Sequence, residues 1–397
     1  MVSVAMLSLQ ELLQAARAHP LYRDWPLEAV RQVGDPAWER LPTLGREALR
    51  NLPLPRASAG ELIYLSTGTV GHPKLVPLGR ADLDRVATLC VRFGALEGIG
   101  SHSRVMVLLP MALWPVGRIT IEGHRRLGAT VYPVDLHGGI DAWQRLVWEL
   151  RPTVISSTPS VLAAWAPYYE GPPLELVETT GEPLMTRERH LIEGRFGARV
   201  HDAYGLTECT VGVECAVRDG FHYWPDATHV EILAPDCDRP VSPGEEGEIV
   251  LTGFQNALLP ILRYRSGDRG RLIPGSCACG HPTPRLQLLG RLRPAFDLPR
   301  GVLLEPETVA DALGSERGVR LRYKNGAESP AAAFVRRNRS PMLEVVYDGS
   351  MPPARARRKL LQAIPELAEL VHEGAVGLEM SGAATGGGRN GEEESVQ

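Results

Sequence analysis

Short apolar runs alternate with amphipathic helical patterns over the first two hundred residues of the chain. The runs are rich in Val, Ile and Leu and read as strands, whereas the segments between them repeat apolar residues at helical spacing. This alternation predicts an α/β fold. The expected strands are 61–65, 105–109, 130–134, 153–156, 175–179 and 198–201, and the expected helices are 80–94, 140–150 and 187–196.

The pattern changes at about residue 210, where short apolar runs are separated by Gly and Pro turns. Runs such as 229–232 and 247–251 predict a β-rich subdomain that closes the large domain. We expect a large domain over 1–291 and a small α+β domain over 292–380, with strands at 319–323 and 343–347 and one helix at 354–372. Residues 381–397 are Gly-rich and then acidic, which predicts a disordered tail.

Composition and charge narrow the class of protein. The 43 Lys and Arg residues nearly balance 47 Asp and Glu, a net charge of −4, so nucleic-acid binding through basic excess is excluded. The longest apolar uncharged run, 105–117, is too short to span a bilayer and contains two prolines. The N-terminal twenty residues lack a basic leader and predict an amphipathic helix. We therefore expect a cytoplasmic protein with reduced cysteines and no membrane association.

The sharpest local motif is the segment LSTGTVGHPK at 65–74, which follows a predicted strand. Glycines let a backbone approach an anion closely, hydroxyl groups donate hydrogen bonds, and Lys74 adds a positive charge. The spacing differs from that of a Walker loop, so a P-loop NTPase is disfavoured. The segment predicts a phosphate-binding loop; the alternative is a polar turn with a surface lysine. Its candidate ligands are Ser66, Thr67, Gly68, Thr69, Gly71 and Lys74.

Two further motifs lie downstream. In DAYGLTE at 202–208, Tyr204 could stack on a purine and Glu208 could hold Mg²⁺ through its oxygens; a helix start at Thr207 is the alternative. In RYRSGD at 263–268, Asp268 could accept hydrogen bonds from ribose hydroxyls, or it could form a structural pair with an arginine. The order and separation of the three motifs are more specific than any one of them.

Four residues have the chemistry of a zinc site. Cys215 and His222 form one half-site and Cys277 and Cys279 the other, and thiolate and imidazole are the ligands that Zn²⁺ prefers. The two halves would join the β-rich subdomain; His281 is a competing ligand, and free buried thiols are the alternative. Cys90, Cys209 and Cys237 stand apart from these half-sites, and we expect them to be packing residues.

Together the three motifs resemble those of the adenylate-forming superfamily, which includes acyl-CoA synthetases and adenylation domains. The resemblance narrows to the phenylacetate–CoA ligase-like branch and runs from about residue 20 to about residue 310. It implies a large adenylate-forming domain with a β-rich subdomain and a small mobile α+β domain. The further segments that carry it are 20–23, 41–43, 127–131, 158–160, 181–184, 214–215, 220–222, 277–280, 284–285 and 290–291.

The resemblance also implies roles for the residues. The 66–74 loop handles the triphosphate, Gly181, Glu182 and Pro183 line the adenine side, and Tyr204 stacks on the base. Thr207 and Glu208 serve phosphate and Mg²⁺, Asp268 binds ribose, and Arg291 approaches the nucleotide near the hinge. Gly205 belongs to the same nucleotide motif, and Trp114 is placed at the pocket for an aromatic acid. The residues implied as catalytic are Lys74, Glu208 and Arg291.

The activity implied is ATP-dependent conversion of a carboxylic acid, expected to be aromatic, to an acyl-adenylate, followed by transfer to the thiol of CoA. ATP and Mg²⁺ are implied as cofactors and Zn²⁺ as a structural ion. Transfer to an amine or a carrier-protein thiol, and a degenerate nucleotide-binding homologue, are the alternatives. A homodimer is left open as the assembly. The chain departs from the family in lacking a lysine after Lys359, where a catalytic C-terminal lysine is expected; Arg389 is the nearest counterpart.

Overall fold

The computed structural model describes residues 4–50, 52, 61–65, 74–111, 114–134, 136, 139–235, 237–292, 296–298, 302–304, 306–314, 319–324, 342–347, 351–372 and 376–382. The chain divides into two compact units between Arg293 and Pro294. Among the described residues, no helix combines the length and apolar character needed to cross a membrane.

An 11-stranded sheet forms the centre of the larger unit, in the order β10-β11-β12-β13-β9-β8-β7-β6-β5-β3-β4. Strands β4, β3, β5, β6 and β7 run parallel, and the sheet becomes antiparallel between β7 and β8. A separate hairpin pairs β1 with β2. The strands are β1 Leu62–Leu65, β2 Leu75–Leu78, β3 Arg104–Leu108, β4 Thr130–Pro133, β5 Val154–Ser157, β6 Leu176–Thr180, β7 Arg199–Gly205, β8 Thr210–Glu214, β9 Phe221–Tyr223, β10 Thr228–Leu233, β11 Gly247–Gly253, β12 Ile261–Ile273 and β13 Arg285–Arg291.

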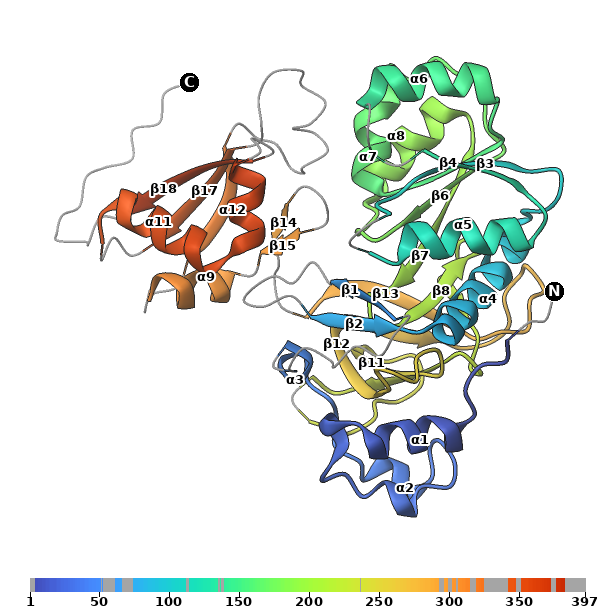
Figure 1. Cartoon of the computed structure of the whole chain (residues 1–397), viewed down its shortest axis with the longest axis vertical. Coiled ribbons are helices and arrows are strands. Elements are labelled where there is room, and N and C mark those ends of the chain that lie inside the picture. Colours follow the sequence, from blue (N-terminus) through green and yellow to red (C-terminus); the bar gives the residue numbers. More distant parts are fainter. Residues whose placement is uncertain are drawn as a thin grey trace, which may run out of the picture. The chain divides into compact units, whose positions relative to one another are not determined.

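Helices cover both faces of the parallel part of the sheet (Figure 1). Helices α6, α7 and α8 pack on one face through an apolar core, and α4 and α5 lie on the other. The α/β layering expected from the alternating pattern is thus present. The helices of this unit are α1 Leu9–Ala18, η1 Pro20–Tyr22, η2 Leu27–Ala29, α2 Pro36–Glu39, α3 Arg46–Arg50, α4 Arg80–Glu97, α5 Val116–Arg126, α6 Gly139–Leu150, α7 Pro159–Trp165, η3 Ala166–Tyr168 and α8 Thr186–Phe196.

Local sequence signals explain where several helices begin and end. Helix α1 starts at a capping box in which the Ser8 hydroxyl accepts the Glu11 N–H and the Glu11 carboxylate accepts the Ser8 N–H. Helix α4 ends at Gly98, whose φ of 88° is the left-handed conformation that glycine adopts without strain. Helix α4 therefore runs to Glu97, three residues beyond its predicted end, and this extension brings the Glu97 side chain to the sheet.

The smaller unit contains the hairpin β14–β15 and a three-stranded sheet in the order β16-β17-β18. The predicted helix over 354–372 is wrong in one respect, because Ile364 interrupts it before Pro365, which cannot continue the ladder of the preceding turn. Residues 383–397 of the predicted tail lie outside the described residues. The elements are β14 Phe296–Leu298, β15 Val302–Leu304, α9 Pro306–Leu313, β16 Arg320–Lys324, β17 Met342–Tyr347, α11 Pro353–Ala363, α12 Pro365–His372 and β18 Gly377–Gly382.

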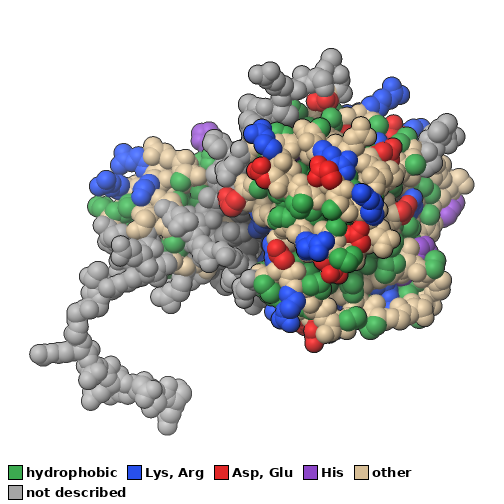
Figure 2. Space-filling view, turned by 90° about the horizontal axis from the view of Figure 1, so that it is seen from below, with side chains coloured by type: hydrophobic (Ala, Val, Ile, Leu, Met, Phe, Trp, Pro, Cys, Tyr) green, Lys and Arg blue, Asp and Glu red, His purple; other side chains and the backbone are tan. Residues whose placement is uncertain are grey.

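Charged side chains are mixed on the surface of the larger unit. On the face shown in Figure 2, acidic and basic side chains alternate with apolar and neutral ones, and neither sign gathers into one continuous patch. This distribution is in keeping with the near balance of 43 basic and 47 acidic residues in the chain.

Candidate active site

The predicted motifs meet at the carboxyl ends of the parallel strands. Gly181 follows β6, Trp114 comes after β3, and Tyr204 and Gly205 end β7. Ligands of open α/β sheets bind at this edge because the loops there converge. Strand β7 is longer than expected and reaches Gly205, so Tyr204 lies within the strand and not in a loop after it.

A buried ion pair joins two of the predicted catalytic residues. Lys74, just before β2, pairs with Glu208, in the turn between β7 and β8. The hydroxyl of Tyr264, from β12, donates to the same Glu208 oxygen at 3.2 Å and lies 3.2 Å from Lys74 Nζ. Burial raises the pKa of Glu208, but the Lys74 ammonium outweighs it, so the net pKa is below its ordinary value. The site thus holds an ionised carboxylate beside a lysine that could meet phosphate.

A second polar group of residues holds Asp268 from both sides. The Tyr204 hydroxyl donates to Asp268 Oδ2 at 2.7 Å, and Arg291 donates to Asp268 Oδ1 at 2.5 Å. Asp268 on β12 and Arg291 on β13 are directly paired in the sheet, which fixes this contact. Burial and the Asp268 carboxylate raise the pKa of Tyr204 well above its ordinary value, so the phenol stays a hydrogen-bond donor.

A cavity of about 140 Å³ opens between α4, α5 and the sheet. Its apolar walls include Phe93, Trp114 and Ile119, and Gly181, Tyr204, Gly205, Thr207 and Glu208 also line it. A cavity of about 150 Å³ with apolar walls accommodates a benzene molecule, so a single ring fits this space. Trp114, which the family resemblance assigns to an aromatic pocket, lines the cavity and is 9% exposed.

Some predicted ligands cannot be placed on this site. Ser66, Thr67, Gly68, Thr69 and Gly71 lie outside the described residues. Gly181, whose φ is 83°, lines the cavity, whereas Pro183 is exposed and the Glu182 carboxylate accepts the backbone N–H of Ser160 at 3.0 Å, at the start of α7. The described part of the predicted site therefore centres on Lys74, Glu208, Tyr204, Asp268 and Arg291.

The sequence did not point to several polar residues that line the cavity, four of which have titratable side chains. These four are Cys90, Glu97, His124 and Glu178. A signal existed for Glu178, because a carboxylate in the apolar strand segment LELVETT is unusual for a buried strand. Cys90, Glu97 and His124 carried no such signal, because polar residues are ordinary in amphipathic helices.

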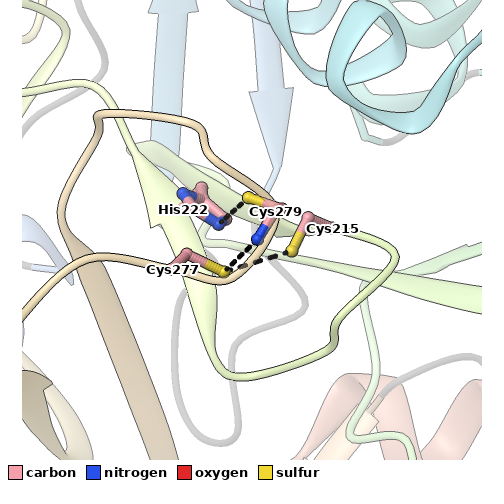
Figure 3. A group of neighbouring side chains, drawn as sticks. All are labelled: Cys215, His222, Cys277 and Cys279. Atoms are coloured by element: carbon pink, nitrogen blue, oxygen red, sulfur yellow. Dashed lines mark hydrogen bonds between the residues drawn. The ribbon is translucent and has the colours of Figure 1, made fainter.

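The predicted zinc ligands form one cluster (Figure 3). Cys215 follows β8, His222 lies on β9, and Cys277 and Cys279 belong to the turn between β12 and β13. One ligand atom from each of the four lies within 4.8 Å of all the others. Cys215 Sγ is 3.7 Å from Cys277 Sγ, and Cys279 Sγ is 3.4 Å from His222 Nε2.

The surroundings of the cluster orient its ligands. His222 Nδ1 lies 2.9 Å from the Thr283 hydroxyl, which leaves Nε2 facing the thiols. The ring of His281, the competing ligand, also contacts Thr283, at 2.8 Å. Burial raises the pKa of Cys277, but the Cys279 backbone N–H and neighbouring thiols outweigh it and hold the pKa below its ordinary value.

The three remaining cysteines have different environments. Cys209 is buried, as expected of a packing residue, and both Cys90 and Cys209 line the cavity. The expectation for Cys237 is wrong, because this thiol is exposed in the loop that follows β10. Its neighbour Asp238 is also exposed, as is usual in a connecting loop.

Comparison with known proteins assigns the chain to a class. The sequence model of the AMP-binding enzyme family matches residues 11–258, which is more than half of the chain. The chain therefore belongs to the AMP-binding enzyme family, as the motif resemblance implied.

Among its relatives, the phenylacetate-coenzyme A ligase of Escherichia coli is 31% identical over 226 residues, covering 54% of this chain and 52% of the relative. The enzyme of the same name from Thermus thermophilus is 31% identical over 264 residues, which cover 63% of this chain and 59% of the relative. The matched part thus spans between half and three fifths of these relatives.

A solved 2-hydroxyisobutyryl-CoA ligase, in complex with 2-HIB-AMP and CoA, superposes with a TM-score of 0.76 at 20% identity, over 97% of this chain and 87% of that one. At this identity the likeness shows the fold alone, which the chain shares with that ligase. The fold class expected from the sequence is thereby confirmed.

Proposed function

We propose that this protein activates a carboxylic acid with ATP to form an acyl-adenylate and then transfers the acyl group to the thiol of CoA. The observation that carries the proposal is the buried Lys74–Glu208–Tyr264 group next to a ring-sized cavity. Membership of the AMP-binding enzyme family supports a nucleotide at this edge of the sheet.

In the first half-reaction the acid carboxylate attacks the α-phosphate of ATP and pyrophosphate leaves. Lys74 exchanges Glu208 for phosphate oxygens and neutralises charge that develops on them. The Glu208 carboxylate, ionised in this site, has the oxygen chemistry that Mg²⁺ requires, and the ion when bound supplies further positive charge to the phosphates. Asp268 is suited to accept ribose hydroxyls, because two donors hold it rigidly.

In the second half-reaction the thiol attacks the acyl carbon, the bond to AMP breaks, and AMP leaves. The roles proposed for Tyr204, Gly181, Glu182, Pro183 and Thr207 are contacts to the adenine and phosphate. An amine or a carrier-protein thiol is the alternative acceptor, and a nucleotide-binding homologue without activity is the alternative class.

Pyrophosphate release tests the proposal, measured with a panel of aryl and alkyl acids in the presence and absence of CoA. We expect Lys74→Ala and Glu208→Ala each to lower the rate by on the order of 10²–10³, the usual cost of losing one group that stabilises developing charge. Lys359→Ala removes an exposed lysine and is the matched control, with a rate close to that of the wild type. Rates within a few-fold of wild type for both site variants would refute the assignment.

We further propose that Cys215, His222, Cys277 and Cys279 hold a structural Zn²⁺. Ligands about 2.3 Å from a tetrahedral ion lie roughly 3.8 Å apart, and the 3.7 Å separation of Cys215 Sγ and Cys277 Sγ fits this value. Such an ion would tie β8 and β9 to the turn between β12 and β13.

Elemental analysis of protein purified without chelator should find about one zinc per chain. Cys277→Ser should lose the metal and lower the melting temperature by on the order of 5–10 °C, because the binding energy of a structural site is folding energy. The control is Cys237→Ser, at an exposed thiol, which should change neither quantity. Protein that carries no zinc would contradict this proposal and leave the proposed activity untouched.

A further inference from the structure

Two hollows in the larger unit share one wall. The first is the cavity between α4, α5 and the sheet that is described above. The second is a groove of about 630 Å³ at the amino ends of the parallel strands, where Ser103 precedes β3 and Val154 and Leu176 begin β5 and β6. Among the residues that the structure describes, Glu97 alone lines both hollows. Glu97 therefore lies between the cavity and the groove.

The end of helix α4 places the Glu97 side chain at this position. Glu97 is the last residue of α4, and Gly98 ends the helix in the left-handed conformation. The side chain is 2% exposed. It hydrogen-bonds to Glu178, which lines the cavity, and its Oε1 lies 3.8 Å from Nδ1 of His201, which lines the groove. One side chain thus reaches from the first hollow to the second, and we call it the partition.

The partition is a neutral group that is held in place. Burial raises the pKa of Glu97 well above its ordinary value, and the neighbouring Glu178 carboxylate adds to this rise. Glu97 therefore keeps its proton, and a buried hydrogen bond to Glu178 restricts the side chain to one position. A glutamine at position 97 would have the same size and the same lack of charge, whereas an alanine would leave the space empty.

The groove has room for a group that passes the partition. Its volume of about 630 Å³ is several times the 140 Å³ of the cavity. A Cβ at Gly98 would meet no described atom within 4 Å, so the space beside the end of α4 is open. Arg199 and Arg218 line the groove and are exposed, so the groove opens to solvent. Only the partition separates the cavity from this solvent-filled space.

The partition lies at the end of the cavity far from the nucleotide edge. Strand β7 ends at Gly205, and Glu208 lies in the turn that follows. Glu97 approaches this strand near its start, at His201, whereas the Lys74–Glu208 pair lies beyond its end. An acid whose carboxylate faces Lys74 therefore extends toward Glu97, and a group added opposite the carboxylate approaches the partition.

We propose that Glu97 sets the upper size of the acid: the enzyme takes an acid with one ring and excludes an acid with a second ring in line, opposite the carboxylate. This inference rests on the proposed function of the same site, and it names the class of substrate. The cavity holds one ring, and a second ring would need the place of the Glu97 side chain. A packed interior yields little to added groups, so such an acid is rejected.

Calorimetry with two pairs of acids tests the inference: phenylacetate with biphenyl-4-acetate, and benzoate with biphenyl-4-carboxylate. Each acid is titrated in the presence of a non-hydrolysable ATP analogue, so that binding is measured apart from adenylation. We expect the wild type to bind the better single-ring acid at least about tenfold more tightly than its two-ring partner, because overpacking is costly. Equal affinity within both pairs, tighter binding of the two-ring acids, or no binding by any of the four acids overturns the inference.

Variants that shorten the partition should admit the second ring. Glu97→Ala should bind the two-ring acid at least about tenfold more tightly than the wild type does and should keep its affinity for the single-ring acid within a few-fold. Glu97→Asp retains a carboxyl group, guards against misfolding of the alanine variant, and should gain several-fold for the two-ring acid. Continued exclusion of the two-ring acids by both variants overturns the assignment to Glu97.

Two further variants separate size from other effects. Glu97→Gln keeps the size of the side chain and can donate to Glu178, so it should keep the wild-type preference. A gain for the two-ring acid as large as that of Glu97→Ala would show that size is not the cause, and it would overturn the inference. Glu175→Ala, at an exposed carboxylate that lines the groove and not the cavity, is the matched control and should also keep the preference.

Pyrophosphate release by the same four acids is measured separately, so that the two proposals fail separately. Size-dependent binding without pyrophosphate release would refute the proposed activity and leave the size limit standing. Pyrophosphate release by the wild type with single-ring and two-ring acids alike would refute the size limit alone.

Discussion

The two faces of the parallel sheet differ in what they bury. On the face toward α7, Ile155 and Val177 belong to a core around Trp165, whose ring centroid lies 5.4 Å from that of Phe196. On the opposite face, the adjacent residues Ser156 and Glu178 line a cavity. The same two strands thus contribute to a close-packed core and to a polar pocket, because their side chains alternate between faces. The difference indicates that the first face provides stability and that the second gives some of it up to keep a cavity open.

The apolar face should carry the largest stability effect. Trp165 is fully buried, and Trp165→Ala should lower the free energy of unfolding by about 3–5 kcal/mol through lost contacts and a new cavity. Trp148, on α6 and 48% exposed, is the control, and its replacement by Ala should cost less than about 0.5 kcal/mol. Urea unfolding measures both. If both variants lost a similar amount of unfolding free energy, the apolar face would not be the main source of stability.

A buried carboxyl next to the cavity residues gives a pH-dependent effect. Burial raises the pKa of Asp202 to about 8, while the Thr179 hydroxyl donates to it at 2.7 Å. The folded state holds this proton more tightly than the unfolded state. The contribution of the protonated Asp202 carboxyl to the free energy of unfolding is therefore complete below about pH 4. It is lost as pH rises toward 8.

Asp202→Asn stays neutral and should escape this loss. The variant should therefore gain stability over the wild type by at most about 1.4 kcal/mol per pH unit between pH 4 and 8. Urea unfolding of both proteins across this range measures the difference. A constant difference would show that Asp202 is already ionised in the folded protein.

The smallest effects are expected from two neighbouring residues of β5, Ile155 and Ser156, whose side chains face opposite sides of the sheet. Ile155→Val should cost about 0.5–1.5 kcal/mol of unfolding free energy and leave acid affinity unchanged. Ser156→Ala should change stability by less than Ile155→Val and should alter the affinity for the acid, because Ser156 lines the cavity. Unfolding and calorimetry on both variants provide the test. If Ile155→Val changed the affinity for the acid and Ser156→Ala lowered the stability more, the two faces would not differ as described.

Several features followed from the sequence because they depend on local pattern. Strand and helix order, the cysteine half-sites and the nucleotide motifs all rest on spacing within a few residues. The sequence predicts one helix over 354–372 because the apolar spacing continues across Pro365, although the proline separates α11 from α12. The sequence predicts a strand that ends at His201 because Tyr204 and Gly205 resemble a loop, although pairing with β8 keeps both residues in strand β7.

By itself, the sequence determined the α/β class and the family motifs, and it singled out Lys74 and Glu208 as candidate site residues. Only the tertiary structure decided that these two form an ion pair, since they are 134 residues apart in the chain. It also decided that His124 and Glu178 face one cavity. Contacts of this kind depend on sheet register and on the approach of two helices, and both are set by packing that no local pattern records.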